Sequence, residues 1–196
     1  MRNIEIKFYS YFLLLLLFVF TGDLIAQTDD GANEKQENVV DQDEKAELIS
    51  DAKKAKAAFI EHSPDLAELF DKSAGYVIFP NVGKGAYILG GAAGNGVLFE
   101  KGGVQGFAEL RQVDIGLQIG GQAFRQAILF QTNSELERFK EGNYRLSGNA
   151  SAVVIEQGEA KSVEFNNGRA IVTMPKAGAM IEISVGGQKF DYKDAN

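Results

Sequence analysis

The chain concentrates glycine in one stretch that is also rich in large apolar residues. Residues 75–121 hold 13 of the 22 glycines, interleaved with Val, Ile, Leu, Phe and Tyr. Flexible linkers combine glycine with serine and other polar residues, whereas the apolar side chains of this stretch need burial. We therefore predict closely packed, sharply turning strands here.

Two parts of this stretch have the composition of phosphate-binding loops, but not their context. A P-loop lysine is followed by Ser or Thr and then a helix, whereas Lys84 is followed by Gly85 and strand-like residues. A dinucleotide fingerprint also leads into a helix, whereas residues 94–96 lead into the strand-like residues 97–99. Nucleotide binding is disfavoured, and the glycines are predicted to permit positive φ or close strand approach; the alternative is a lipid-facing or ligand-facing glycine surface. The predicted structural glycines are Gly83, Gly85, Gly90, Gly91, Gly94, Gly96, Gly116 and Gly120.

The first 26 residues have the pattern of a secretory signal peptide. Arg2 and Lys7 flank a short basic region, an apolar run follows over residues 8–20, and Ala26 supplies a small residue for cleavage. A membrane-spanning helix needs ~17 apolar residues or more, and this run is shorter. We predict cleavage after Ala26 and export to the periplasm or cell envelope; the alternative is an uncleaved membrane anchor.

The formal net charge of −7 is not spread evenly along the chain. Residues 27–47 carry eight acids and two lysines, whereas residues 48–196 carry 17 acids and 16 bases. The acidic part has low hydrophobicity and no apolar periodicity, which is typical of disorder. We predict a signal peptide over 1–26, an acidic disordered leader over 27–44, and one nearly neutral domain over 45–196, with no nucleic-acid partner.

Apolar spacing and capping signals predict three helices. The first covers about 41–62, where Leu48, Ala52, Ala55 and Phe59 share one face. Ser63 and Pro64 predict the N-cap and first position of a short second helix over 65–73. A capping box from Ser134 to Glu137 predicts a third helix that ends near residue 141, before Gly142.

The other apolar segments predict strands. Pro80 is expected to stop the first strand, Lys101-Gly102-Gly103 to form a hairpin turn, and residues 166–168 to form another turn. The expected strands cover 76–79, 86–89, 97–100, 104–110, 113–119, 123–131, 150–156, 162–165, 169–174 and 181–192. We predict an α+β fold: an antiparallel β-sheet or partly closed barrel, packed by the N-terminal helices and one mid-chain helix.

No combination of residues in the sequence predicts catalysis, a cofactor or a metal site. The chain has no Cys, and His62 is its only histidine. These counts exclude disulfides and thiolate or His-rich metal sites. The sequence lacks a G-x-S-x-G elbow, and Glu135 and Glu137 are expected on a solvated helix surface. We therefore expect a protein that is not an enzyme.

Lysines are the candidate contacts for lipid headgroups. Lys53, Lys54 and Lys56 occupy one turn of the first predicted helix. Each base near an anionic membrane surface contributes about 1 kcal/mol, although clusters of about four to eight bases are typical of an anionic-lipid site. A solvated helix face is the alternative. The candidates are Lys53, Lys54, Lys56, Lys84 and Lys101.

The middle of the chain resembles the SYLF domain. The likeness covers roughly residues 49–192 and is most specific in the order of glycine and apolar positions between 71 and 120. The matching segments are DKSAGYVIFPNVGKG (71–85), GG (90–91), GNGVLF (94–99), GLQIG (116–120) and KAG (176–178).

The resemblance implies lipid binding. Eukaryotic SYLF domains bind phosphoinositides in endocytic proteins, some also engaging actin, and bacterial members are exported envelope proteins, several of them lipoproteins. This chain lacks a lipobox Cys and an SH3 domain, and its domain is nearly neutral rather than basic. Phosphoinositide preference and actin binding are therefore not carried over, whereas binding to phospholipid in general is.

We therefore predict a non-catalytic phospholipid-binding protein of the cell envelope, whose partner is a phospholipid or membrane surface. One alternative is a structural or interaction protein whose glycine-edged strands pair with an envelope partner. Another is a carrier that holds a small apolar ligand in an internal cavity.

Overall fold

The computed structural model describes residues 30–83, 91–113, 123–147, 149–156, 162–176 and 185–195. The chain divides into two compact units, Met1–Val39 and Val40–Asn196, and the first contributes only the start of one helix to the described residues. The predicted signal peptide, the predicted strand over 86–89 and most of the one over 113–119 lie outside the described residues. So do the candidate residues Lys84, Gly85, Gly90, Gly116 and Gly120.

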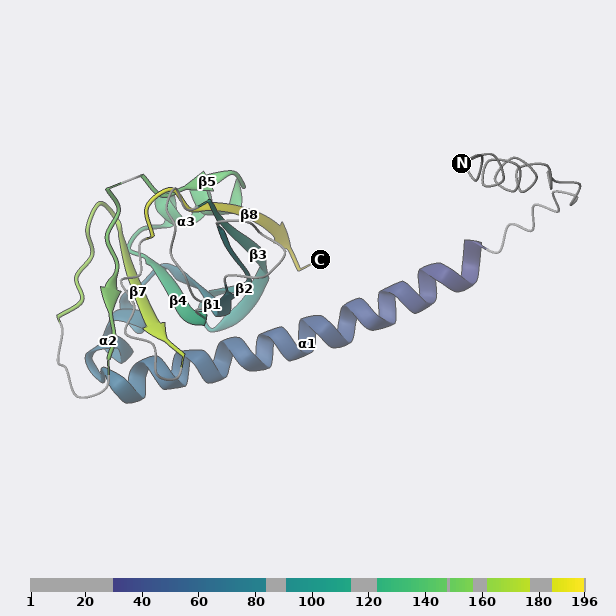
Figure 1. The fold of residues 1–196 in the computed structure, drawn as a ribbon, viewed down its shortest axis with the longest axis horizontal. Coiled ribbons are helices and arrows are strands. Elements are labelled where there is room, and N and C mark those ends of the chain that lie inside the picture. Colours follow the sequence, from purple (N-terminus) through teal and green to yellow (C-terminus); the bar gives the residue numbers. More distant parts are fainter. Residues whose placement is uncertain are drawn as a thin grey trace, which may run out of the picture. The chain divides into compact units, whose positions relative to one another are not determined.

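An eight-stranded sheet is the frame of the described domain. Its spatial order is β5-β8-β3-β2-β1-β4-β7-β6, and it curls into a partly open barrel (Figure 1). The strands are β1 (Gly75–Gly83), β2 (Gly91–Glu100), β3 (Gly103–Val113), β4 (Ala123–Phe130), β5 (Tyr144–Arg145), β6 (Val153–Val154), β7 (Arg169–Pro175) and β8 (Lys189–Asp194). All neighbouring pairs are antiparallel apart from β6 and β7. The predicted α+β class with a partly closed barrel is confirmed, but the sheet is mixed rather than wholly antiparallel.

The described residues form three helices, as the capping and spacing patterns predict. They are α1 (Asp30–His62), α2 (Asp65–Lys72) and α3 (Asn133–Lys140). The predicted ends of α1 and of α3 agree with the structure to within one residue. The predicted start of α1 and the predicted N-caps of α2 and α3 differ from the structure.

Helix α1 begins at Asp30, well before the predicted start near residue 41. Residues 30–40 contain the helix formers Ala, Glu, Gln and Lys and no proline. The low hydrophobicity of these residues and their lack of apolar periodicity had indicated disorder. The helical conformation of residues 30–44 corrects that expectation, while the division into leader and domain stays a prediction.

The caps of α2 and α3 lie at different residues from those predicted. Pro64, rather than Ser63, holds the N-cap position of α2, and no side chain caps that helix. Thr132 caps α3, because its hydroxyl accepts a hydrogen bond from the backbone N–H of Glu135 at 3.3 Å. The predicted Ser134 cap is therefore wrong by two residues. Thr132 and Glu135 have the same capping-box spacing, and the extended backbone of Thr132 selects this register.

Strand β1 continues through Pro80, where the sequence predicted a stop. Its register against β4 shifts between Phe79 and Val82, so Pro80 lies in an irregular step of the ladder. A proline has no N–H to donate and is tolerated at such irregular positions. In contrast, the structure describes residues 162–165 but gives them no strand, although one was predicted there. The strand predicted over 150–156 is reduced to β6.

The predicted turns adopt left-handed backbone conformations. Lys101 and Gly102 join β2 to β3 with φ values of 50° and 79°. Asn167 and Gly168 have φ values of 51° and 78° before β7. Two successive residues with positive φ match the right-handed twist of the flanking strands, so the hairpin predicted at residues 101–103 is confirmed.

Glycines in β2 allow close approach to β1. A Cβ added at Gly96 would lie 2.6 Å from Cδ1 of Phe79, and one added at Gly94 would lie 2.6 Å from the carbonyl oxygen of Asn81. Gly83 has no atom within 4 Å of such a Cβ, so no close contact requires glycine there.

The core has two layers, one on each face of the curled sheet. The inner layer lies inside the barrel and under α3, and includes Phe79, Phe130, Phe139 and Phe190. The outer layer joins the sheet to α1 and α2. Its helical members are Ala52, Ala55 and Phe59 of α1 and Leu66 and Phe70 of α2. Strands β1 and β4 contribute to both layers and are therefore buried on both faces.

Lys56 joins α1 to α2 and β1. Its Nζ lies 4.9 Å from the ring centroid of Phe70 and 4.5 Å from that of Tyr76, and it donates a hydrogen bond to the Tyr76 hydroxyl at 3.0 Å. The rings of Phe70 and Tyr76 are themselves in edge contact at 4.9 Å. Cation–π contacts of this kind contribute roughly 0.5–2 kcal/mol.

We expect Lys56→Met to lower the free energy of unfolding by about 1 kcal/mol, because Met fills the space but removes the cation and the hydrogen bond. Urea titration measures this change. Lys53→Met, on the exposed surface of the same helix, is the control and should change stability by less than about 0.5 kcal/mol. Equal effects of the two substitutions would contradict a structural role for Lys56.

A second stability prediction concerns the glycines. Gly96→Ala should destabilise by about 1–3 kcal/mol, because the new methyl group overlaps the buried Phe79 ring. Gly103→Ala is the matched control, since its nearest non-neighbouring atom is 3.6 Å away. Thermal or urea unfolding of both variants checks this prediction, and a neutral Gly96→Ala variant would refute it.

Candidate functional site

The structure places the candidate lysines in different environments. Lys53 and Lys54 lie on the exposed surface of α1, and Lys54 forms an ion pair with Asp51 at 3.0 Å. Lys56 is engaged by Phe70 and Tyr76, so its ammonium is not presented to a ligand. Lys101 occupies the β2–β3 turn. Lys84 lies outside the described residues.

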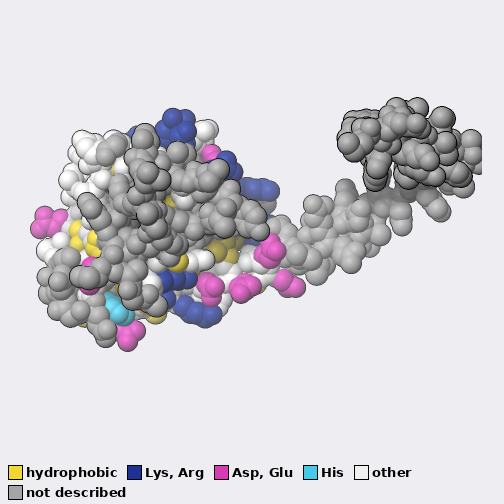
Figure 2. Space-filling view, in the orientation of Figure 1, with side chains coloured by type: hydrophobic (Ala, Val, Ile, Leu, Met, Phe, Trp, Pro, Cys, Tyr) yellow, Lys and Arg dark blue, Asp and Glu magenta, His cyan; other side chains and the backbone are white. Residues whose placement is uncertain are grey.

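Two bases that were not among the candidates lie close to each other, and one of them, Lys176, lies close to Asp51, the ion-pair partner of Lys54. Arg125 is near the start of β4 and donates to the sulfur of Met174 at 3.5 Å. Lys176 directly follows β7, and its backbone N–H donates to the carbonyl of Ala123 at 2.9 Å. We call Lys54, Arg125 and Lys176 the basic cluster, because Asp51 pairs with Lys54 and interacts with Lys176, which in turn interacts with Arg125. Figure 2 shows Lys and Arg side chains gathered where α1 passes the end of β7, with Asp and Glu side chains next along the helix.

The electrostatics of Lys176 show that these groups act on one another. Burial lowers the pKa of Lys176 below its usual value, the positive charge of Arg125 lowers it further, and the charge of Asp51 opposes both. The Lys176 ammonium also donates to the side-chain carbonyl of Asn81 at 3.1 Å. A partly desolvated ammonium next to a second cation favours an incoming anion.

The basic cluster lies at one end of the sheet. The pairing of Gly91 with Val113 and of Phe124 with Pro175 marks this end. The turn that carries Lys101 lies at the opposite end of the β2–β3 hairpin. The structure therefore brings Lys54 together with Arg125 and Lys176, and separates these residues from Lys101.

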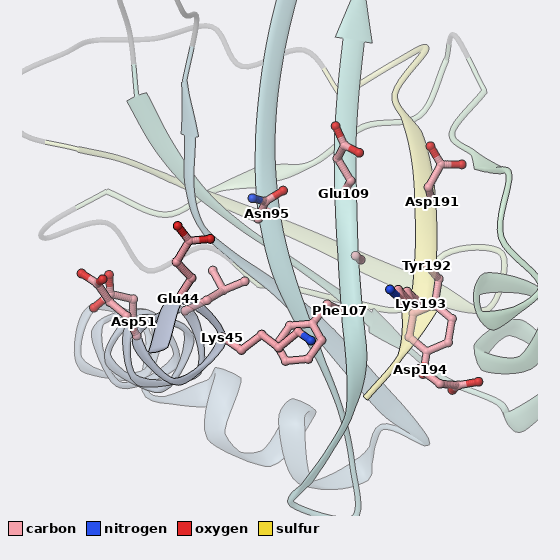
Figure 3. A pocket seen from close by; sticks show the side chains of 13 residues that line it. Glu44, Lys45, Asp51, Asn95, Phe107, Glu109, Asp191, Tyr192, Lys193 and Asp194 are labelled. Carbon is pink, nitrogen blue, oxygen red and sulfur yellow. The ribbon is translucent and has the colours of Figure 1, made fainter. Parts of the chain in front are cut away.

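A surface groove of about 580 Å³ lies between α1 and the outer face of the sheet (Figure 3). We call it the acidic groove, because six of its lining residues are acids and two are lysines. One wall is α1, and the other consists of residues from β2, β3 and β8 (Figure 3). The acids are Glu44, Glu47, Asp51, Glu109, Asp191 and Asp194, and the lysines are Lys45 and Lys193.

Two acids of the groove face each other across the sheet. The register of β3 and β8 places Glu109 directly opposite Asp191, and Figure 3 shows both carboxylates on the same side of the sheet. Like charges at directly opposite positions destabilise a strand pair. Arg111 reduces the repulsion, since its guanidinium donates to both oxygens of Glu109 at 2.7 and 2.6 Å. The hydrogen bond and charge of Glu109 raise the pKa of Arg111 above its usual value.

Aromatic residues complete the groove. The ammonium of Lys45 lies 5.6 Å from the ring centroid of Phe107. The hydroxyl of Tyr192 donates to Asp194 at 2.8 Å. Burial raises the pKa of Tyr192 most, followed by its hydrogen bond to Asp194 and the charges of Asp194, Glu137 and Glu100. Tyr192 also packs against the inner core layer and its ring lies 6.1 Å from that of Phe139, so the charges of Glu137 and Glu100 act on it from the barrel side of β8 rather than from the groove.

A second hollow, of about 610 Å³, lies beside β6 and β7. Its lining is rich in Ser and Asn, with Phe165 and Arg169 among the other residues. Arg169 donates to the Tyr144 hydroxyl at 3.0 Å and lies 3.5 Å from Glu135. Its guanidinium therefore anchors α3 to β7.

The barrel interior contains a buried polar cluster that the sequence analysis missed. The side chains of Gln126 and Gln188 donate to each other at 2.7 and 3.0 Å, and Gln188 also donates to Gln112 at 3.0 Å. Thr173 lies opposite Gln126 on β7, and its buried hydroxyl has no hydrogen-bond partner among the described residues. Side chains alternate between the two faces of β4 and β7. Which of them point into the barrel can be predicted only after the strand register is known.

The described residues offer little that suggests catalysis or metal binding. His62 ends α1, and its Nδ1 lies 2.9 Å from the carbonyl oxygen of Ala58 in the same helix. Within the described ranges, no group of three or more His, Asp or Glu residues is placed to hold a metal ion. In the same part of the chain, no helix combines the length and apolar character needed to cross a membrane.

Comparison with known proteins gives one relative and no family. No protein-family model matches the chain. The chain is 24% identical over 128 residues to beta cell expansion factor A of Aeromonas veronii, and this alignment covers 65% of the chain. It covers 49% of the relative, so the chain spans about half the length of that protein. The chain therefore has weak similarity to beta cell expansion factor A.

Proposed function

We propose that this chain is a non-catalytic phospholipid-binding protein of the cell envelope and that the basic cluster contacts the lipid phosphates. The observation that carries the proposal is the convergence of Lys54, Arg125 and Lys176 from three separate elements. The SYLF-like residue order and the signal-peptide pattern are the sequence features that support it.

The basic cluster has the charge and the hydrogen-bond donors needed to contact a phosphate group. Asp51 neutralises only part of the charge, because it pairs with Lys54 and lies close enough to Lys176 to affect the pKa of that lysine. Side chains of Arg and Lys together supply both bidentate and point-charge contacts to phosphate oxygens. Lys53 is exposed on the same helix as Lys54.

The described part of the barrel interior gives less support to the alternative function, a carrier that holds a small apolar ligand in an internal cavity. Phe79, Phe139 and Phe190 are fully buried, and successive ring centroids lie 5.6–5.8 Å apart inside the barrel. Aromatic side chains therefore occupy the space in which an apolar ligand would lie. Surface binding of lipid is the form of the proposal that the structure favours.

The test compares vesicle binding by the full chain and by the triple variant Lys54→Gln, Arg125→Gln, Lys176→Gln. We expect the parent chain to co-sediment with phosphatidylcholine vesicles that contain phosphatidylglycerol. The variant should bind about a hundredfold more weakly, since three bases at about 1 kcal/mol each are lost. Added salt should weaken binding of the parent chain.

The control variant is Lys72→Gln, Arg145→Gln, Lys189→Gln, which removes the same residue types from exposed positions elsewhere. It should bind nearly as well as the parent chain. Because all three proteins keep residues 1–26, any difference among them reports on the substituted bases. Equal vesicle binding by parent chain and cluster variant would overturn the assignment of the basic cluster, and no binding by the parent chain would overturn the function.

A further inference from the structure

We infer that the acidic groove is a docking site for an extended, lysine- or arginine-rich polypeptide segment. This inference is independent of the proposed phospholipid binding, because it concerns a surface of opposite charge. It starts from the part of the outer sheet face that α1 and α2 leave uncovered.

The helices cover the outer face of β1, β2 and β4, while on β3 only Val104 and Phe107 pack against the outer core layer and the outer face of β8 is left open. Tyr76, Val97 and Leu129 are buried in the outer core layer under the helices. On β3 and β8, the outward residues Glu109, Asp191 and Lys193 are exposed or line the groove. An uncovered sheet face next to a helix forms a trough with two walls, as Figure 3 shows.

Both walls carry carboxylates. Along α1, Glu44, Glu47 and Asp51 are spaced about one turn apart, which places them on one face of the helix. Across the trough, Glu109 and Asp191 lie side by side on β3 and β8. Successive side chains of an extended peptide point in opposite directions. A peptide lying along the trough would therefore direct alternate basic side chains to each wall.

The groove retains an electrostatic cost that a cationic partner would relieve. Glu109 and Asp191 are directly opposite; Arg111 forms its ion pair with Glu109, and its charge also interacts with Asp191. A bound ammonium or guanidinium beside Asp191 would offset the remaining repulsion.

Phe107 provides a surface that accepts a cation. The Lys45 ammonium already lies over its ring, 5.6 Å from the centroid. Phe107 is only partly buried, on the open face of β3. Arginine or lysine side chains of a partner have the chemistry to pack on the same ring. Charge complementarity and this aromatic contact together favour a basic polypeptide over an anionic surface.

The experiment measures binding of a short fluorescein-labelled oligolysine to the full chain by fluorescence anisotropy. The groove variant is Glu44→Gln, Glu109→Gln, Asp191→Asn, and we expect its Kd to be about tenfold weaker than that of the parent chain. The control variant is Glu61→Gln, Glu141→Gln, Asp71→Asn, which makes the same charge change at exposed positions elsewhere. Its Kd should stay within about twofold of the parent value.

A second readout separates docking from general charge effects. Asp191→Asn alone should weaken oligolysine binding, whereas Asp71→Asn alone, which makes the same charge change at an exposed position elsewhere, should leave it unchanged. The inference is overturned if the groove and control variants bind oligolysine equally well, or if Asp191→Asn leaves oligolysine binding unchanged. Loss of phospholipid binding in the basic-cluster variant has no bearing on these results.

Discussion

Burial of β1 on both of its faces is the constraint on which the rest of the structure depends. Val77 and Phe79 point into the barrel, while Tyr76 and Ile78 point toward α1 and α2. The strand also pairs with β2 on one side and β4 on the other. Both core layers and the centre of the sheet therefore meet in a few consecutive residues. The glycines of β2 follow from this arrangement, because a side chain at Gly96 would displace the Phe79 ring.

This central arrangement also determines which surfaces are left for binding. Since α1 covers one part of the outer sheet face, its acidic residues border the uncovered part and its later lysines lie near the ends of β4 and β7. Asp51 lines the acidic groove and pairs with Lys54 of the basic cluster. Two surfaces of opposite charge thus lie next to each other on a domain whose net charge is nearly zero. The proposals assign a different class of partner to each surface.

Local signals in the sequence were sufficient for the fold class, the hairpin at residues 101–103 and the end of α1, because each depends on spacing or turn chemistry. They were insufficient where contacts with distant parts of the chain determine the local structure. The irregular step at Pro80 requires the β4 partner, and the cap of α3 requires the backbone conformation of Thr132.

For the site, Lys54 was among the candidates because it lies in a run of lysines. Arg125 and Lys176 are isolated in sequence, and only the pairing of β4 with β7 brings them together. Lys56 was a candidate for the same reason as Lys54, yet helical geometry turns it toward Phe70 and Tyr76.

Hydrogen exchange with and without vesicles that contain phosphatidylglycerol tests the central claim most directly. The account predicts that vesicles slow exchange around the basic cluster, in α1 near Lys54 and at the adjoining ends of β4 and β7. The β2–β3 turn at Lys101 and the acidic groove should exchange at unchanged rates. Protection centred on Lys101 or on the groove, with none at the basic cluster, would contradict the account.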